Sequence, residues 1–494
     1  LVKAEVTWPT DINKKPRPLK SFDPRPHQKK AINNVIAKFK KADKGQLIMA
    51  CGTGKTFTSI KIAERLKAKR ILVLVPSLNL VNQSIKEWNH NYKTQFKMCV
   101  VCSDETVVKG KDAAILSTAS LSLPPTTNAR KIKAFLKQRT KNPQVVFCTY
   151  QSSNKIAEAQ KKDFIKFDLV LADEAHRCAG LSGETYGLVI DDRKIKSKKK
   201  LFMTATPRII GDRVKKHAED VGQEIFSMCD REKFGEVFHE LKFSDAIKDK
   251  ILTNYQVAVV GVIGDKNKNF VTEGQIIKVE KNVQTDARTL ASQIGLAKAI
   301  KKYNLQKIIT FHSSVAKAKK FGVSSSLDNN NLEAFSDLIP KLPKKVVPTK
   351  NIWTQAISGE MPVDRRIDYL NILEKPDRNS ICLIANCRCL SEGVDVPALD
   401  GVGFMDPKSS QIDIIQAVGR AIRKSDTKKI GTIFIPVFID EKDDVDTTLS
   451  NSAFKPVWSV IRALRSHDDD LADKLDAMRI SLGQNKKISL PTKI

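Results

Sequence analysis

Short apolar runs recur along the chain and are separated by segments long enough to form helices. Continuous apolar runs of this length are typical of strands that are buried on both faces of a parallel sheet. Strands that alternate with helices predict an α/β fold. The clearest predicted strands lie at residues 71–75, 145–149, 169–172 and 200–203, and then at 307–311, 380–385, 401–405 and 432–437.

The chain has 494 residues, which is too many for one hydrophobic core. We expect a first α/β domain over residues 21–235 and a second over 236–446, each built on a parallel sheet. Residues 1–20 are rich in lysine and proline, which predicts a linker or strap. Helical periodicity at 453–482 predicts a helical C-terminal segment over 447–494.

The run at 49–56, Met-Ala-Cys-Gly-Thr-Gly-Lys-Thr, is the strongest chemical signal in the chain. It follows the apolar end of a strand at 46–48 and precedes helical periodicity at 57–66. A phosphate-binding loop needs this strand–loop–helix context. The one departure from the plain pattern is Met49, which stands where the first glycine is expected.

Each residue of this loop has a chemical reason to be there. Gly52 and Gly54, with Thr53 between them, let the backbone fold closely around anionic oxygens. Lys55 can reach the terminal phosphates of a nucleotide, and the Thr56 hydroxyl can hold a magnesium ion. The sequence therefore predicts a nucleotide site here.

Two acidic residues follow the predicted strand at 169–172. Open α/β sheets bind ligands at the carboxyl ends of their strands, so Asp173 and Glu174 are expected to face a substrate. Asp173 can hold Mg²⁺, directly or through water, and Glu174 can polarise the water that attacks a γ-phosphate. A solvated turn would explain the acids alone, but their place downstream of a phosphate loop favours the catalytic interpretation.

Phe22 and Gln28 lie just before or at the start of a predicted helix at 29–40. The glutamine could read the edge of an adenine base, and the Phe22 ring could stack on that base. An ordinary segment at the start of a helix would contain the same residues. The residues by themselves leave both interpretations open.

Taken together, these motifs make the chain resemble the superfamily 2 helicases, which have two RecA-like domains. The resemblance extends from about residue 20 to about residue 440, with the motifs in the family's order. The first is an adenine-sensing motif, carried here by Phe22, Arg25 and Gln28. The resemblance implies that ATP and Mg²⁺ bind in a cleft between the two domains, with Lys55 and Thr56 on one side.

The later nucleotide motifs fall in the second domain. Motif V resembles residues 390–397, so the resemblance places Gly393 and Asp395 at the nucleotide. Motif VI resembles 416–423, where four residues at i, i+3, i+4 and i+7 would share one helix face. Two guanidiniums there suit the arginine-finger role, although surface charge on a basic helix is the alternative. The four residues are Gln416, Gly419, Arg420 and Arg423.

Three further motifs contact nucleic acid in this family, and this chain has a match for each. They resemble motif Ia after the strand at 71–75, motif Ib after the strand at 145–149, and motif IV after the strand at 307–311. The resemblance therefore assigns nucleic-acid binding to Pro76, Ser77, Gln83, Thr149, Gln151, His312 and Ser313. In addition, Thr204 and Thr206 resemble motif III, which couples the nucleotide to the nucleic acid.

A narrower resemblance rests on residues 172–180, 214–228 and 234–239. These stretches look like the motor of single-chain type ISP restriction–modification enzymes. In those enzymes a nuclease domain precedes the motor, and methyltransferase and target-recognition domains follow it. The resemblance thus implies covalently linked nuclease and methyltransferase domains, and the start at Leu1 suggests a piece of a longer protein.

Composition agrees with a nucleic-acid partner. There are 85 Lys and Arg residues against 55 Asp and Glu, a net charge of +30, which favours a polyanion, although a generally basic surface is the alternative. The nine cysteines form no disulfide framework or zinc pattern, which fits buried thiols and a reducing cytoplasm. No apolar run reaches the roughly 20 residues that cross a bilayer, so we expect no membrane partner.

The resemblance to type ISP motors implies an ATP-driven translocase on double-stranded DNA that belongs to a restriction–modification enzyme. Backbone contacts should dominate its DNA binding, which would then be salt-sensitive and independent of sequence. One alternative is a helicase that separates the strands of DNA or RNA. Another is a nucleotide-gated clamp that holds nucleic acid without moving along it.

Overall fold

The structure is a computed structural model of the chain. It describes residues 22–103, 125–161, 165–181, 185–220, 223–264, 269–272, 275–278, 287–324, 334–359, 361–387, 399–406, 410–425, 430–440, 455–468, 471 and 473. The predicted strap at 1–20 and the predicted site residues Gly393 and Asp395 lie outside the described residues. Within those described ranges, no helix is long and apolar enough to cross a membrane.

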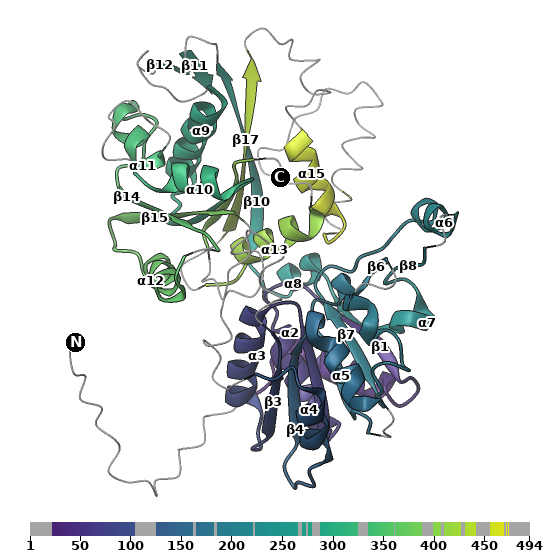
Figure 1. Ribbon diagram of the computed structural model, residues 1–494. Helices are drawn as coiled ribbons and strands as arrows, with labels where there is room; N and C mark the ends of the chain where they lie inside the picture. The colour runs from purple at the N-terminus through teal and green to yellow at the C-terminus, as the bar shows by residue number, and fades with distance from the viewer. Residues whose placement is uncertain are drawn as a thin grey trace, which may run out of the picture.

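The first domain is built on a seven-stranded sheet in which every neighbouring pair is parallel. Its strand order is β3-β4-β2-β5-β7-β1-β9 (Figure 1). The strands are β1 Lys44–Met49, β2 Arg70–Val75, β3 Lys97–Val101, β4 Gln144–Thr149, β5 Leu169–Ala172, β7 Lys200–Thr204 and β9 Glu236–Leu241. The short strands β6 (Gly180–Leu181) and β8 (Ile225–Phe226) form a separate antiparallel pair.

Helices connect these strands and cover the sheet. The helices are α1 Pro26–Lys38, α2 Lys55–Arg65, α3 Leu78–Asn91, α4 Ala129–Lys137, α5 Ser153–Gln160, α6 Asp212–Asp220, α7 Arg231–Phe234 and α8 Phe243–Lys248. Three 3₁₀ turns, η3 Tyr150–Ser152, η4 Ala175–Cys178 and η5 Thr185–Val189, lie between them. Figure 1 shows α6 standing apart from the rest of this domain.

The second domain is built on an eight-stranded sheet with the order β12-β11-β10-β17-β16-β13-β15-β14. Six of its strands form a parallel array, and the β11–β12 hairpin adds to it in antiparallel fashion. The strands are β10 Asn254–Gly264, β11 Asn269–Thr272, β12 Gln275–Lys278, β13 Lys307–His312, β14 Asn351–Ile357, β15 Ser380–Cys387, β16 Gly401–Phe404 and β17 Ile430–Asp440. The helices are α9 Ala287–Tyr303, α10 Val315–Gly322, α11 Phe335–Leu338, α12 Val363–Glu374, α13 Gln411–Ala421 and α15 Lys455–Arg465, with a 3₁₀ turn η6 at Ile339–Lys341.

The predicted fold class is therefore confirmed: two RecA-like α/β domains with largely parallel sheets. The continuous apolar runs have the predicted cause, because every residue of β4 and of β5 is buried. A strand that is covered by helices on both faces has no solvent side, so it carries no alternating polar positions. The eight strands predicted from the sequence all appear, with ends that shift by at most a residue or a few.

The boundary between the domains differs from the prediction of 235/236. Strand β9 pairs with β1 and so belongs to the first sheet. Helix α8 follows at once, and its Phe243 and Ala246 are fully buried. We therefore propose that the first domain extends through α8 and that the second begins near β10.

The C-terminal helix connects the two domains. Helix α15 buries Val460 and Leu464 and packs against α13. Just beyond it, the backbone N–H of Phe243 in α8 donates to the His467 carbonyl at 3.2 Å. The Tyr255 hydroxyl in β10 donates to the Asp468 carboxylate at 2.6 Å. Residues 455–468 thus contact both domains.

Candidate active site

The loop after β1 has the backbone of a phosphate cradle. Met49 is the last residue of β1, and its side chain is fully buried in the core, so the strand runs one residue beyond its predicted end at 48. The turn is made by Gly52 and Gly54, whose φ angles are +83° and +88°. Residues other than glycine seldom adopt these angles, which explains the two glycines. Helix α2 begins at Lys55 and directs its N-terminal N–H groups to the loop.

Residues at the start of α1 contact the backbone of this loop. The Gln28 amide donates to the Thr53 carbonyl at 3.2 Å, and His27 Nε2 lies 2.9 Å from the same oxygen. The other end of the Gln28 amide accepts from the Arg25 backbone N–H at 2.9 Å. A Cβ atom on Gly54 would lie 2.3 Å from Gln28 Nε2, so the contact needs glycine. Gln28 holds the loop, and its predicted contact with adenine stays a prediction.

The two acids lie at the carboxyl end of β5, as the sequence predicts. Lys55 Nζ is 3.5 Å from Glu174 Oε1, and His176 Nδ1 is 3.3 Å from Glu174 Oε2. Glu174 has a φ of +49°, which is unusual for a residue with a side chain and is found at functional sites. Asp173 lies next to it and accepts the Glu174 backbone N–H at 3.0 Å.

The charges in this group shift one another's pKa values. Burial raises the pKa of Asp173, Lys55 offsets part of that effect, and the neighbouring Glu174 raises the pKa further. Burial also disfavours the Glu174 carboxylate, but Lys55 and His176 outweigh that effect and hold the pKa of Glu174 well below its ordinary value. Burial opposes the charge on Lys55, yet the two carboxylates raise the pKa of that lysine. The site therefore keeps a charged lysine beside a charged glutamate.

A histidine links the acids to the next strand. His176 Nδ1 lies 3.0 Å from the Thr204 hydroxyl, and that hydroxyl accepts the Thr206 backbone N–H at 3.0 Å. This contact joins the acid pair to the predicted coupling residues Thr204 and Thr206. The Tyr150 hydroxyl donates to the Asp173 carbonyl at 2.7 Å and fixes the same strand end. The sequence motifs assigned no role to His176, which lies within residues 172–180, or to Tyr150, which follows the strand at 145–149.

The second domain reaches this loop through α13. A Cβ atom on Gly419 would lie 2.5 Å from the Cys51 Cβ, so only glycine lets the helix approach so closely. Helix α13 ends at Ala421, so Arg423 lies beyond the helix and the predicted single helix face is wrong for that residue. It still reaches the same place, since a Cβ on Gly52 would meet Arg423 Cγ at 3.8 Å.

One cavity of about 410 Å³ brings the predicted nucleotide residues of both domains together. From the first domain it is lined by Gly52, Gly54, Lys55, Thr56, Asp173 and Glu174, and from the second by Gln416, Gly419, Arg420 and Arg423. An adjoining cavity of about 950 Å³ is lined by Phe22, Arg25, Gln28, Thr53 and other residues. Both cavities have Gly52, Gly54, Phe57, Gln83 and Glu87 in their walls.

The donor set suits Mg²⁺ held together with phosphates. Thr56 and Asp173 line the same cavity and offer a hydroxyl and a carboxylate oxygen. In the described part of the chain, no three His, Cys, Asp or Glu residues form a metal cage. Mg²⁺ characteristically takes one or two protein oxygens and completes its shell with water and phosphate oxygens.

The predicted nucleic-acid residues fall into two groups. Pro76, Thr149 and His312 are buried, and burial lowers the pKa of His312 to about 4. A buried side chain cannot touch DNA directly, so we correct these three from contact to supporting positions. Ser313 is exposed, and its backbone N–H and hydroxyl both donate to Asp406, at 2.8 and 3.0 Å.

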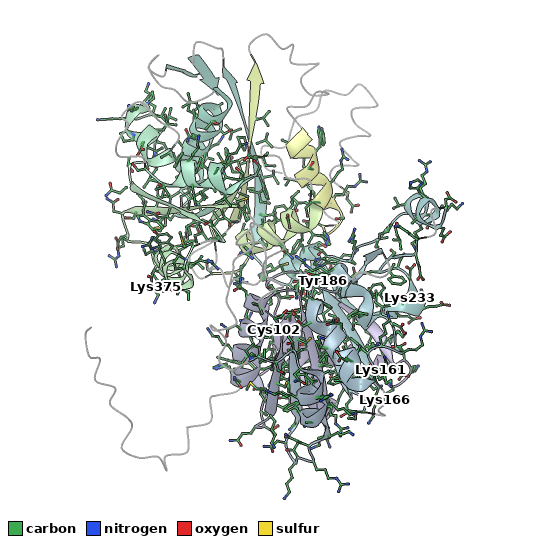
Figure 2. All side chains as sticks on the ribbon, in the orientation of Figure 1. Cys102, Lys161, Lys166, Tyr186, Lys233 and Lys375 are labelled. Atoms are coloured by element: carbon green, nitrogen blue, oxygen red, sulfur yellow. The ribbon has the colours of Figure 1, made fainter. Side chains whose placement is uncertain are left out.

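The remaining three residues of this set are partly buried. Ser77 caps α3 by accepting the Leu80 N–H at 3.4 Å. The Gln151 amide donates to the Pro76 carbonyl at 3.3 Å and to the hydroxyl of Tyr186, which is labelled in Figure 2. Gln83 lines both cavities beside the phosphate loop, so the structure places it on the nucleotide side.

Two family models match the chain. The model described as the res subunit of type III restriction enzymes matches residues 21–209, and the helicase conserved C-terminal domain matches residues 295–425. The chain carries the two domains of a superfamily 2 helicase-like ATPase. The match to the first model covers the phosphate loop and the acid pair, and the match to the second covers α13 and Arg423.

Relatives of this helicase-like ATPase are longer than the chain. Proteins of African swine fever virus named "probable helicase" are 24–26% identical to the chain over 86% of its residues. The matched region spans 42% of the length of these viral proteins. The endonuclease subunit of the Escherichia coli type I restriction enzyme EcoAI is 26% identical over 51% of the chain. The match covers 26% of the length of that subunit.

The solved structures point the same way. The type ISP restriction–modification enzyme LlaBIII bound to DNA is 30% identical with a TM-score of 0.76, over 95% of this chain and 31% of that one. A nuclease-deletion mutant of the type ISP enzyme LlaGI, in complex with a DNA substrate mimic, is 30% identical with a TM-score of 0.62, over 92% of this chain and 30% of that one. The helicase-like ATPase therefore resembles part of the type ISP restriction–modification enzymes.

Proposed function

We propose that the chain is a motor that hydrolyses ATP to move along double-stranded DNA. One observation carries the proposal: a single cavity is lined by the phosphate loop and acid pair of the first domain and by Gln416, Arg420 and Arg423 of the second. A site divided between two domains is complete only when they are together. Nucleotide binding closes such a cleft and hydrolysis reopens it, so each cycle of hydrolysis moves one domain relative to the other.

The residues have distinct chemical roles in this proposal. Lys55 and the N-terminal N–H groups of α2 bind the phosphates, and Thr56 and Asp173 hold Mg²⁺, which neutralises phosphate charge. Glu174 polarises the attacking water, and its low pKa keeps it ionised for that role. Arg420 and Arg423 stabilise the charge that develops on the transferred phosphoryl group.

Double-stranded DNA is the proposed track. The enzymes LlaBIII and LlaGI, which this chain resembles, were solved with DNA or a DNA mimic bound. The net charge of +30 fits a partner with a phosphate backbone. By the same resemblance, and because the relatives are longer, we propose that the full-length protein carries linked nuclease and methyltransferase domains.

A parallel measurement of ATP turnover tests the proposal. The chain is assayed with duplex DNA, single-stranded DNA and RNA, and then in triplex-displacement and fork-unwinding assays. We expect stimulation by duplex DNA and displacement of a third strand without fork unwinding. Stimulation by single strands or RNA alone, or no stimulation by any of them, contradicts the proposal.

A strand-separating helicase is the second candidate, favoured by the name of the viral relatives. Fork unwinding that depends on ATP would establish it in place of the translocase. A nucleotide-gated clamp would bind nucleic acid without nucleic-acid-stimulated turnover. The presence of Glu174, Arg420 and Arg423 in one cavity argues against the clamp, because a clamp needs no groups that accelerate hydrolysis.

A further inference from the structure

The larger cavity next to the phosphate loop has a wall that the sequence motifs do not account for. On the first-domain side it is lined by the residues around α1 and by α3. On the other side it is lined by α12 of the second domain, through Arg366, Ile367, Leu370 and Asn371. None of the motifs identified in the sequence includes a residue of α12. A second-domain element therefore faces the end of the cleft that lies beyond the phosphates.

Two exposed apolar side chains line this cavity from opposite domains. Phe22 is 63% exposed and Ile367 is 49% exposed. Exposed apolar surface that lines a cavity marks a place where a ligand can bury it. A flat aromatic base placed between a phenyl ring and an isoleucine would remove both from water, and an aromatic face suits the Phe22 ring.

The same cavity also offers unused hydrogen-bond acceptors. Asn91 is 6% exposed, and its amide nitrogen donates to the Glu87 carbonyl at 3.0 Å and to the Glu87 carboxylate at 3.3 Å. Those two bonds fix which end of the Asn91 amide is oxygen. That Oδ1 atom is buried and has no hydrogen-bond partner among the described residues, and the same holds for Asn82 Oδ1. Both residues line the cavity.

Buried acceptors without partners are costly and call for a donor. The exocyclic amino group of adenine is a donor of this kind, and it can meet one of the two oxygens, because Asn82 and Asn91 lie about 13 Å apart along the axis of α3. The cavity therefore combines two apolar faces from different domains with a wall that includes Asn82 and Asn91. A purine base that carries an amino group matches this combination.

We propose that Ile367 is a positioning residue for the base of ATP, which it covers from the second domain while Phe22 supports it from the first. The inference rests on the proposed function, because it places the base of the bound nucleotide in this cavity. Recognition of the base is then shared between the domains. A ligand that contacts both domains binds the closed cleft better than the open one, so the base itself favours closure.

The test compares Ile367→Ala with Ile372→Ala. Ile372 is on the same helix and is 41% exposed, but it is not among the residues that line the cavity. Binding of ATP and of inorganic tripolyphosphate to the whole chain is measured by calorimetry. We expect Ile367→Ala to weaken ATP binding about tenfold, since it removes methyl and methylene contacts with the base. Tripolyphosphate has no base, so its affinity should not change.

The controls separate this inference from the proposed function. Ile372→Ala should bind both ligands like the wild type, and Ile367→Leu should recover most of the ATP affinity. Unchanged ATP binding in Ile367→Ala overturns the inference, and so does an equal loss for both ligands. A wild type that binds ATP but shows no duplex-stimulated turnover overturns the proposed function alone. A wild type that binds no ATP overturns both.

Discussion

Lys200, which is buried, and Lys55, which is partly buried, lie at opposite edges of the first sheet, and each is paired with an acid. At the amino edge, Lys200 Nζ is 2.7 Å from Asp192 Oδ1 and donates to the Val189 carbonyl at 2.7 Å. At the carboxyl edge, Lys55 Nζ is 3.5 Å from Glu174 Oε1. The first lysine has short contacts and the second has a long one. A long contact is easily exchanged for a ligand, and short contacts are not.

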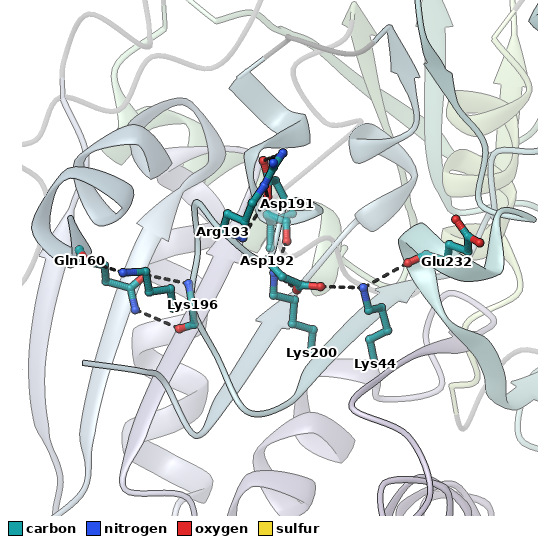
Figure 3. Close-up of polar contacts among 9 residues, drawn as sticks. Lys44, Gln160, Asp191, Asp192, Arg193, Lys196, Lys200 and Glu232 are labelled. Atoms are coloured by element: carbon teal, nitrogen blue, oxygen red, sulfur yellow. Dashed lines mark hydrogen bonds and ion pairs between the residues drawn. The ribbon is translucent and has the colours of Figure 1, made fainter. Parts of the chain in front are cut away.

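The two edges also differ in how far their polar groups are satisfied. At the amino edge Lys44 adds a second bond to Asp192, at 2.8 Å, and one to the Glu232 carbonyl, at 3.1 Å (Figure 3). At the carboxyl edge the Thr149 and Thr206 hydroxyls are buried and have no partner among the described residues. A closed network stabilises the fold, whereas a buried hydroxyl without a partner costs free energy.

The pKa values of the two lysines are shifted in opposite directions. Burial lowers the pKa of Lys200, and Asp192 offsets only part of that effect. Burial has the same sign at Lys55, but Glu174 and Asp173 together raise the pKa of that lysine. The two carboxylates therefore keep Lys55 charged, which binding of phosphates requires. The comparison predicts that changes at the two edges have different consequences.

Removing an arginine that faces the carboxyl edge should have the largest effect on turnover. Arg420→Ala is expected to lower duplex-stimulated ATP turnover by about 10³–10⁵-fold, because the charge on the transferred phosphoryl group loses its partner. Arg462→Ala is the control, since Arg462 is exposed on α15, which packs against α13. Steady-state turnover of the two variants decides the matter. Equal turnover rates for the two variants would show that Arg420 does not contribute to catalysis.

Lys55→Ala should lower turnover by about 10²–10³-fold, because one preorganised positive charge is lost at the phosphates. The melting temperature should change little, since Glu174 keeps its contact with His176. Turnover and thermal unfolding are measured on the same sample. A large fall in the melting temperature would show that Lys55, like Lys200, has a structural role, and the comparison would fail.

His176→Ala should reduce turnover about tenfold, because the histidine positions Glu174 without touching the substrate. The loss should appear in kcat and leave the KM for ATP unchanged. His217→Ala is the matched control, because His217 is exposed on α6. A KM change without a kcat change would show that His176 serves binding rather than the position of Glu174.

Asp192→Ala should leave turnover unchanged and lower stability. The change leaves the Lys200 charge buried beside a single carbonyl, but Asp192 is itself 58% exposed, so the cost is about 1–3 kcal/mol. For a domain of this size the melting temperature should fall by roughly 2–4 °C per kcal/mol. Asp191→Ala is the control, because its partner Arg193 is at the surface. Lost turnover with an unchanged melting temperature would contradict this assignment.

The sequence predicted the parts of the fold that rest on continuous apolar runs and on local motifs. Strands such as β4 and β5 were visible because they are buried on both faces, and the loop at Gly52 and Gly54 because its backbone needs glycine. Strand β9 was assigned to the wrong domain, because nothing local in a strand says which sheet it joins. Pairing between distant strands is decided by the whole chain.

The site was predicted as far as its motifs reach. The nucleotide residues of both domains do line one cavity. The sequence spacing did not predict that α13 ends at Ala421, or that Gln83 lies beside the phosphate loop. Spacing gives the face of a helix and not where the helix ends. The contact of Ile367 with the same cleft as Phe22 joins residues more than three hundred positions apart, and no local pattern records it.

The most direct test of the account is the duplex-stimulated ATP turnover of Glu174→Gln. The change keeps the shape of the side chain and removes its charge, so the carboxyl edge should retain its fold. We predict that turnover is lost while DNA binding and the melting temperature stay close to those of the wild type. Full turnover in Glu174→Gln would show that the chemistry does not take place at this edge of the sheet.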